Sequence, residues 1–199
     1  MSADNLALLR QQLASGETEA AENTAKGLQT VSGLAFAKLA GAIQHAINAR
    51  QPAVALLLLA DSERFCADGD SAEMLVRMEE LSSLIASCRQ EKLDEPARRA
   101  SALALELLNV ADFPQSSEAI GVVARFAGSA GSYALRRRDL DWFSPLALQT
   151  AGWASRCENR LLDVQFLPVL EIWMHRATRH KLLEAVPIIF EAVHLLVMA

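Results

Sequence analysis

The chain has 199 residues, of which 52% are hydrophobic and 22% charged, and its formal net charge at pH 7 is −5. This balance is typical of an ordered globular protein and excludes a disordered chain. The negative charge disfavours a general polyanion binder, because sequence-independent affinity for nucleic acid comes from neutralising phosphates. Helix-forming residues dominate and no segment alternates with the period of a strand, so we expect an all-α protein.

The cellular location is predicted from segments that the sequence lacks. The start, "MSADNLALLRQQL", has neither the basic nor the apolar region of a secretory signal. The strongest apolar run, "PAVALLLLA", is shorter than the roughly 20 residues that span a bilayer. Cys66, Cys88 and Cys157 are odd in number and lie in apolar helical patterns, which predicts buried thiols in a reducing compartment. We expect a cytoplasmic protein that does not enter the membrane.

The N-terminal part predicts a first helix over about residues 4–14. An apolar stripe then runs from Thr24 to Ala46 with helical spacing, which predicts one long helical stretch. Gly27, Gly33 and Gly41 weaken this stretch, and a break near Gly33 is an open alternative.

Three further helices are predicted from their start signals. Pro52 suits the first turn of a helix that continues through "AVALLLLA". Asp70 with Glu73 forms a capping box that opens the next helix. Asp94 then caps a helix with Pro96 in its first turn, and "DFPQSS" ends it.

The C-terminal third repeats one phrase at a fixed interval. Leu140, Leu161 and Leu182 are 21 residues apart, and around each the order is basic residues, Leu, an acid and then Pro. Cations suit the negative end of a helix, whereas an acid and Pro suit the start of the next one. Two helices would make a unit of about 42 residues. The expected helices are 117–137, 141–158, 163–179 and 184–198.

These elements predict a multi-helix antiparallel bundle or a short α-solenoid with about 8–9 helices. The helix-pair unit resembles the tetratricopeptide and HEAT solenoids in architecture alone, since none of their consensus positions can be matched. An N-terminal bundle part, 1–111, and a C-terminal repeat part, 118–199, are expected to share one core. The candidate boundary is 112–117, which combines a proline with two serines.

Residues 14–65 resemble a histidine phosphotransfer domain in rhythm: a turn of small residues, a long helix, a second turn near "NARQPA" and a returning helix. Such domains carry a phosphorylatable His in the middle of a helix. Here Asn23 or Lys26 stands at about that position, and neither accepts a phosphoryl group in this way. The resemblance therefore implies a degenerate, non-phosphorylating signalling adaptor.

Motifs for chemistry are scarce. Glu191 and His194 have the Glu-x-x-His spacing of di-iron four-helix bundles, but such a site needs a second copy of the motif and two more carboxylates. The sequence has no nucleophile elbow and no phosphate-binding loop. We therefore predict no catalytic residue, no metal ion and no cofactor. An enzyme whose site assembles in a helical-bundle pocket is kept as an alternative.

The final helix suggests a function, because it is apolar on nearly all sides and is expected to be buried against other helices or a partner. We predict a non-catalytic protein–protein interaction module, as an adaptor, scaffold or regulatory subunit, that self-associates or binds a protein partner. The candidate interface residues are Ile189, Phe190, Val193, Leu196 and Val197.

A second hypothesis is an anion- or nucleic-acid-binding regulator. In an up-down array the turns near residues 138 and 181 lie at the same end, so their cations would form one basic pole. The acidic net charge makes nucleic acid the less favoured partner. The basic pole comprises Arg136, Arg137, Arg138, Arg179, His180 and Lys181.

Overall fold

The computed structural model describes residues 2–28, 35–62, 70–157 and 162–197, and over these residues the chain forms ten α-helices. This confirms the all-α prediction. The helices are α1 (Ser2–Ser15), α2 (Thr18–Leu28), α3 (Phe36–Asn48), α4 (Pro52–Asp61), α5 (Ser71–Glu91), α6 (Asp94–Leu108), α7 (Ser117–Arg137), α8 (Leu140–Ala154), α9 (Leu162–Arg179) and α10 (Ala185–Val197).

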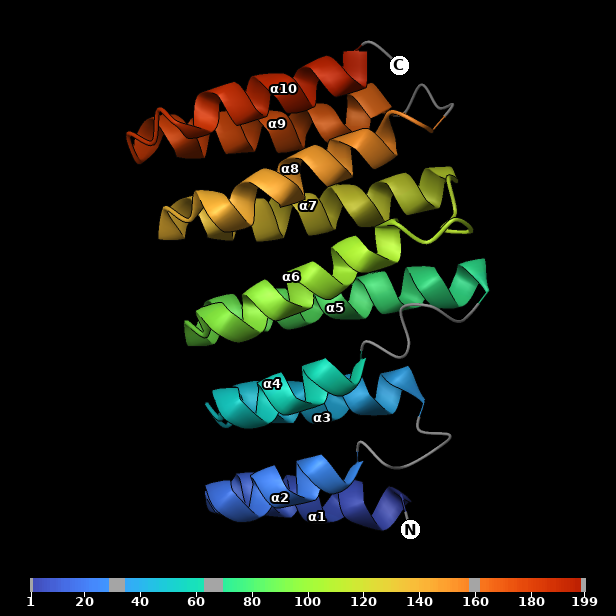
Figure 1. Cartoon of the computed structure of the whole chain (residues 1–199), viewed down its shortest axis with the longest axis vertical. Coiled ribbons are helices and arrows are strands. Elements are labelled where there is room, and N and C mark those ends of the chain that lie inside the picture. The colour runs from blue at the N-terminus through green and yellow to red at the C-terminus, as the bar shows by residue number, and fades with distance from the viewer. Residues whose placement is uncertain (1, 29–34, 63–69, 158–161, 198–199) are drawn as a thin grey trace.

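The helices form a stack of five antiparallel pairs in two layers (Figure 1). In the odd layer α1 packs on α3, α3 on α5, α5 on α7 and α7 on α9. In the even layer α2 packs on α4, α4 on α6, α6 on α8 and α8 on α10. Among the described residues, the main contacts of each pair are therefore with the pairs before and after it, which is the arrangement of an α-solenoid.

The repeat length differs between the two ends of the stack. The starts of α7 and α9 are 45 residues apart, as are those of α8 and α10, close to the unit of about 42 predicted for this region. The starts of α1, α3 and α5 are 34 and 35 residues apart, because α1 to α4 are only 10 to 14 residues long. Leu161, one of the three repeated leucines, lies outside the described residues.

The long helical stretch predicted from Thr24 to Ala46 was wrong, and the alternative of a break is correct. α2 ends at Leu28 and α3 begins at Phe36, while Gly33 lies outside the described residues. The two helices belong to different pairs: α2 packs on α1 and α4, whereas α3 packs on α4 and α5. Periodicity alone could not separate them, because each helix buries a stripe with the same 3-4 spacing.

Every odd-numbered helix ends in the same turn, which reverses the chain into the even layer. One residue there adopts a positive φ of 53° to 76°, and the next residue donates its backbone N–H to the carbonyl five residues earlier. Leu93 bonds Cys88 in this way over 2.9 Å, and Asp139 bonds Ala134 over 3.0 Å. This is the Schellman motif, in which glycine is favoured. The positive-φ residues are Gly16, Arg50, Lys92, Arg138 and Lys181.

Lys92→Gly is predicted to raise the free energy of unfolding by about 0.5–1 kcal/mol, because the left-handed region penalises a residue with a Cβ atom. Lys92 is exposed and has a φ of 60°. Urea denaturation followed by circular dichroism measures the change. Gln90→Gly, two residues earlier in α5, is the matched control and should lower stability instead. Equal losses in both variants would contradict the prediction.

The core is continuous along the stack, since buried hydrophobic residues from Leu6 to Ala192 form one cluster. α5 packs on α7 and α6 packs on α8 across residues 112–117. The division into two parts at these residues stays a prediction. Cys88 and Cys157 are buried and unbonded, as predicted, and Cys66 lies outside the described residues. Burial raises the pKa of the Cys88 thiol to about 12 and that of Cys157 to about 11.

Gly131 of α7 lies where α7 packs closely on α9. Of the described glycines, it leaves the least room for a Cβ atom. The indole of Trp173, 1% exposed, lies against Gly131 and donates from Nε1 to the carbonyl of Ala127 over 3.2 Å. A Cβ atom at Gly131 would clash with Trp173 Nε1 and stand 2.7 Å from Trp173 Cε2. Because Gly131 has no side chain, the indole of Trp173 can lie against α7 and donate its N–H to a backbone carbonyl.

Gly131→Ala is predicted to lower the free energy of unfolding by about 1–3 kcal/mol, since the indole must move and its hydrogen bond is disturbed. Gly128→Ala is the control, because a Cβ atom there meets Val169 Cγ2 at an ordinary 3.7 Å. That variant should be neutral or gain up to about 1 kcal/mol of helix propensity. Denaturant unfolding of both proteins tests the contrast, and similar values for the two would refute it.

Candidate functional site

The two turns of the predicted basic pole lie at the same edge of the stack. The α7–α8 turn and the α9–α10 turn both appear at the left of Figure 1. Arg136, Arg138, Arg179 and Lys181 are exposed there, and His180 is half-buried. Whether these cations bind a ligand depends on how their charge is balanced by nearby acids.

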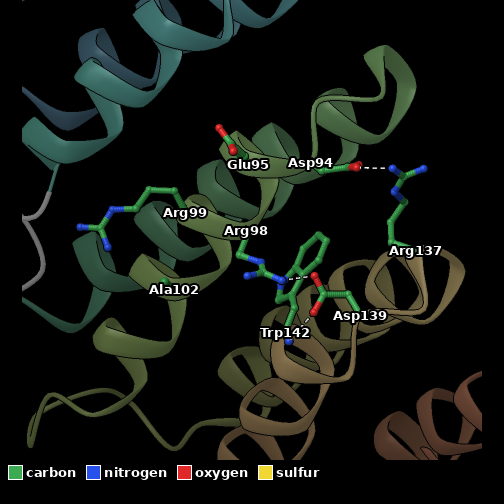
Figure 2. A pocket seen from close by; sticks show the side chains of 8 residues that line it. All are labelled: Asp94, Glu95, Arg98, Arg99, Ala102, Arg137, Asp139 and Trp142. Carbon is green, nitrogen blue, oxygen red and sulfur yellow. Dashed lines mark hydrogen bonds and ion pairs between the residues drawn. The ribbon is translucent and has the colours of Figure 1, made fainter.

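A charged cavity of about 680 Å³ opens at this edge, between the start of α6 and the start of α8. Figure 2 shows arginines and carboxylates facing one another across it. Three basic and three acidic side chains line the cavity, so it carries no net formal charge. Its lining residues are Asp94, Glu95, Arg98, Arg99, Ala102, Arg137, Asp139 and Trp142.

Ion pairs across this cavity join the third helix pair to the fourth. Arg137 Nη2 lies 2.5 Å from Asp94 Oδ2, and Arg98 pairs with Asp139 (Figure 2). Asp139 also caps α8 by accepting the backbone N–H of Trp142 over 3.0 Å. Both pairs are partly exposed and each contributes about 0–1 kcal/mol. The two ion pairs hold neighbouring helix pairs together. One cation of the predicted basic pole, Arg137, is already paired with Asp94.

Tyr133 extends this network into the core. Its hydroxyl donates to Asp94 Oδ1 over 2.6 Å, and its ring packs edge-to-face on Trp142 with centroids 5.3 Å apart. Burial raises the pKa of Tyr133 above its ordinary value, and the hydrogen bond to Asp94 and the charge of that carboxylate raise it further. The neutral phenol is therefore the form that the fold stabilises. No local pattern in the sequence links Tyr133 with Asp94, because the two residues lie 39 positions apart.

The free energy of unfolding should fall at alkaline pH, because Tyr133 then loses its proton. Its folded pKa lies above the unfolded value of 10.0, so its contribution is complete below pH 10 and is lost as pH rises through the folded pKa. Above pH 10 the wild type should lose free energy of unfolding faster than Tyr133→Phe, by up to about 1.4 kcal/mol per pH unit. Denaturant unfolding between pH 8 and 11 measures both. Parallel curves would contradict this role of Tyr133.

The predicted interface residues of α10 divide between core and surface. Ile189 is only 1% exposed, and Val193 and Leu196 are half-buried. Phe190 and Val197 are 62% and 74% exposed. The structure thus leaves two of the five predicted residues open to a partner.

Sequence reasoning missed the rest of this surface. Leu183 is 72% exposed and precedes Phe190 and Val197 at seven-residue steps, and Pro187 and His194 are exposed between them. The 3-4-3 spacing from Pro187 to Val197 places these four residues along one face of α10, and Leu183 lies in the turn before them. That spacing was readable in the sequence. We call Leu183, Pro187, Phe190, His194 and Val197 the α10 stripe.

The other candidate residues of the sequence form no evident reaction centre. Asn23 and Lys26 are exposed on α2, and Glu191 and His194 are exposed on α10. Within the described ranges, no group of three or more His, Cys, Asp or Glu side chains is placed to hold a metal ion. Likewise, no helix in these ranges has the length and apolar character to cross a bilayer.

Comparison with known proteins yields no match: no family model, no curated protein and no solved structure is similar enough to this chain.

Proposed function

We propose that the chain is a non-catalytic scaffold that binds another protein chain through the α10 stripe. The observation that carries this proposal is the exposure of Phe190 and Val197 on α10, together with that of Leu183 in the turn before it. Burying a large apolar side chain contributes about 1.5–3 kcal/mol, so a stripe of three is a strong site for association. Exposed apolar surface of this kind is typical of protein-interaction sites.

The place of α10 in the stack supports the same conclusion. α8 packs between α6 and α10 within the even layer, whereas α10 packs on α8 alone in that layer among the described helices. Its sequence, "AVPIIFEAVHLLV", has only Glu191 and His194 as polar residues. A partner helix laid along the stripe would therefore meet few charges that need to be desolvated.

The basic pole supports a ligand less well. Arg137 and Arg98 are paired with carboxylates, and the cavity beside them has balanced charge. An anion would have to compete with Asp94 and Asp139 for these guanidinium groups. The network at this edge is better explained as a contact between helix pairs.

Phe190→Asp should abolish association through α10, because a carboxylate would be buried without a partner. The native complex is isolated by a tag on the chain, and light scattering measures its mass. We expect a mass above the 21.6 kDa of one chain for the wild type and a single chain for the variant, with affinity reduced at least about tenfold.

Glu191→Gln is the matched control, since residue 191 is exposed on the same helix but lies outside the stripe. It should keep the wild-type mass. A photo-crosslinking residue at position 190 would identify the partner or a second copy of the chain, and one at exposed Asn23 should not. The proposal fails if the wild type is a single chain that forms no crosslink from position 190.

A further inference from the structure

Three grooves cross the outer face of the odd layer, away from the α10 stripe. They lie between α3 and α5, between α5 and α7, and between α7 and α9, with volumes of about 430, 410 and 540 Å³. None of their lining residues comes from an even-numbered helix. All three therefore lie along the odd layer, the first two near the helix starts and the third reaching the middle of α7 and α9.

The grooves are largely apolar; the first two adjoin each other, and an ion pair lies between the second and the third. The first two share Ala72 and Val76, and Val76 is 52% exposed between them. Glu79 of the second groove pairs with Arg125 of the third over 2.8 Å. Ile172, 45% exposed, borders the third groove. Two of the exposed large hydrophobic side chains thus stand along one line of cavities.

The charge along this line is negative. Asp70, Glu73, Glu79 and Glu118 line the grooves, against two arginines. Both arginines are already paired, Arg77 with Glu73 over 2.9 Å and Arg125 with Glu79. Asp70 also caps α5 by accepting the backbone N–H of Glu73 over 2.9 Å. With Glu118, it leaves the lining with two more acids than bases, in a chain whose net charge is −5. A cationic ligand complements this surface.

The spacing of the grooves sets the shape of the ligand. Packed helices lie about 8–10 Å apart, and an extended peptide in the polyproline II conformation rises about 3.1 Å per residue with three residues per turn, so every third side chain points the same way and would reach the next groove. From these observations we propose that the odd-layer face binds an extended peptide segment of a partner protein. The segment carries an apolar side chain at every third position and Lys or Arg between them.

Fluorescence anisotropy with synthetic peptides on the full chain tests this proposal. The matched probe is a labelled heptapeptide with leucine at its first, fourth and seventh positions and lysine between. Two control peptides replace lysine by glutamate or move the leucines to the first, third and fifth positions. We expect the matched probe to bind with a dissociation constant in the micromolar range and both controls to bind at least about tenfold more weakly.

Variants of the chain locate the site. Gly128→Leu fills the third groove, where a Cβ atom makes only ordinary contacts. The variant should bind the matched probe at least about tenfold more weakly. Glu118→Gln should weaken binding of the matched probe about threefold and make that binding less dependent on salt. Phe190→Asp, on the α10 stripe, should leave it unchanged, which separates this site from the proposed function. Circular dichroism confirms that each variant is folded.

The proposal is overturned if the matched probe does not bind, if the control peptides bind equally well, or if the groove variants bind like the wild type. Tighter binding of the same residues in a peptide stapled as a helix would also overturn it, because the groove would then belong to a helical partner.

Discussion

The turn that ends each odd-numbered helix is the constraint on which the rest of the structure depends. Its left-handed residue and its 6→1 hydrogen bond reverse the chain within two to five residues and send the next helix into the even layer. Four of the five turns place Arg or Lys in this conformation, where glycine would be least strained. The long side chains are retained at an edge where cations also face the negative ends of the helices.

This placement gives the two edges of the stack different properties. At the turn edge, Arg50 pairs with Glu91 over 2.7 Å, and Arg137 pairs with Asp94, so charges beside two of the turns contact a neighbouring helix pair. Toward the opposite edge, the starts of the odd helices leave grooves with exposed Val76 and Ile172. Salt bridges at the first edge orient the pairs, while buried apolar area along the stack supplies most of the stability.

The sequence predicted much of the fold, because helix starts and stops are local signals. The capping box at Asp70 and the proline start at Pro52 stand where α5 and α4 begin, and the range 117–137 is α7 as observed. The break between α2 and α3 was left open, since two consecutive amphipathic helices share one period. The site was less predictable: the contact of Tyr133 with Asp94 joins residues 39 apart, and no local pattern reports it. The turn edge itself was predicted, but not the carboxylates that balance its arginines.

A stack of this kind keeps its surfaces energetically separate. Over the described residues, each helix pair packs mainly on its neighbours, so a change at α10 reaches α3 and α5 chiefly through the pairs between them. Changes at distant sites without shared partners add independently. The grooves between α3 and α7 can therefore be occupied without altering the α10 stripe, whereas the groove between α7 and α9 adjoins the last pair. Trp173 is the residue most able to couple them, because it contacts Gly131 of α7 and packs on Phe143 of α8, which adjoins α10.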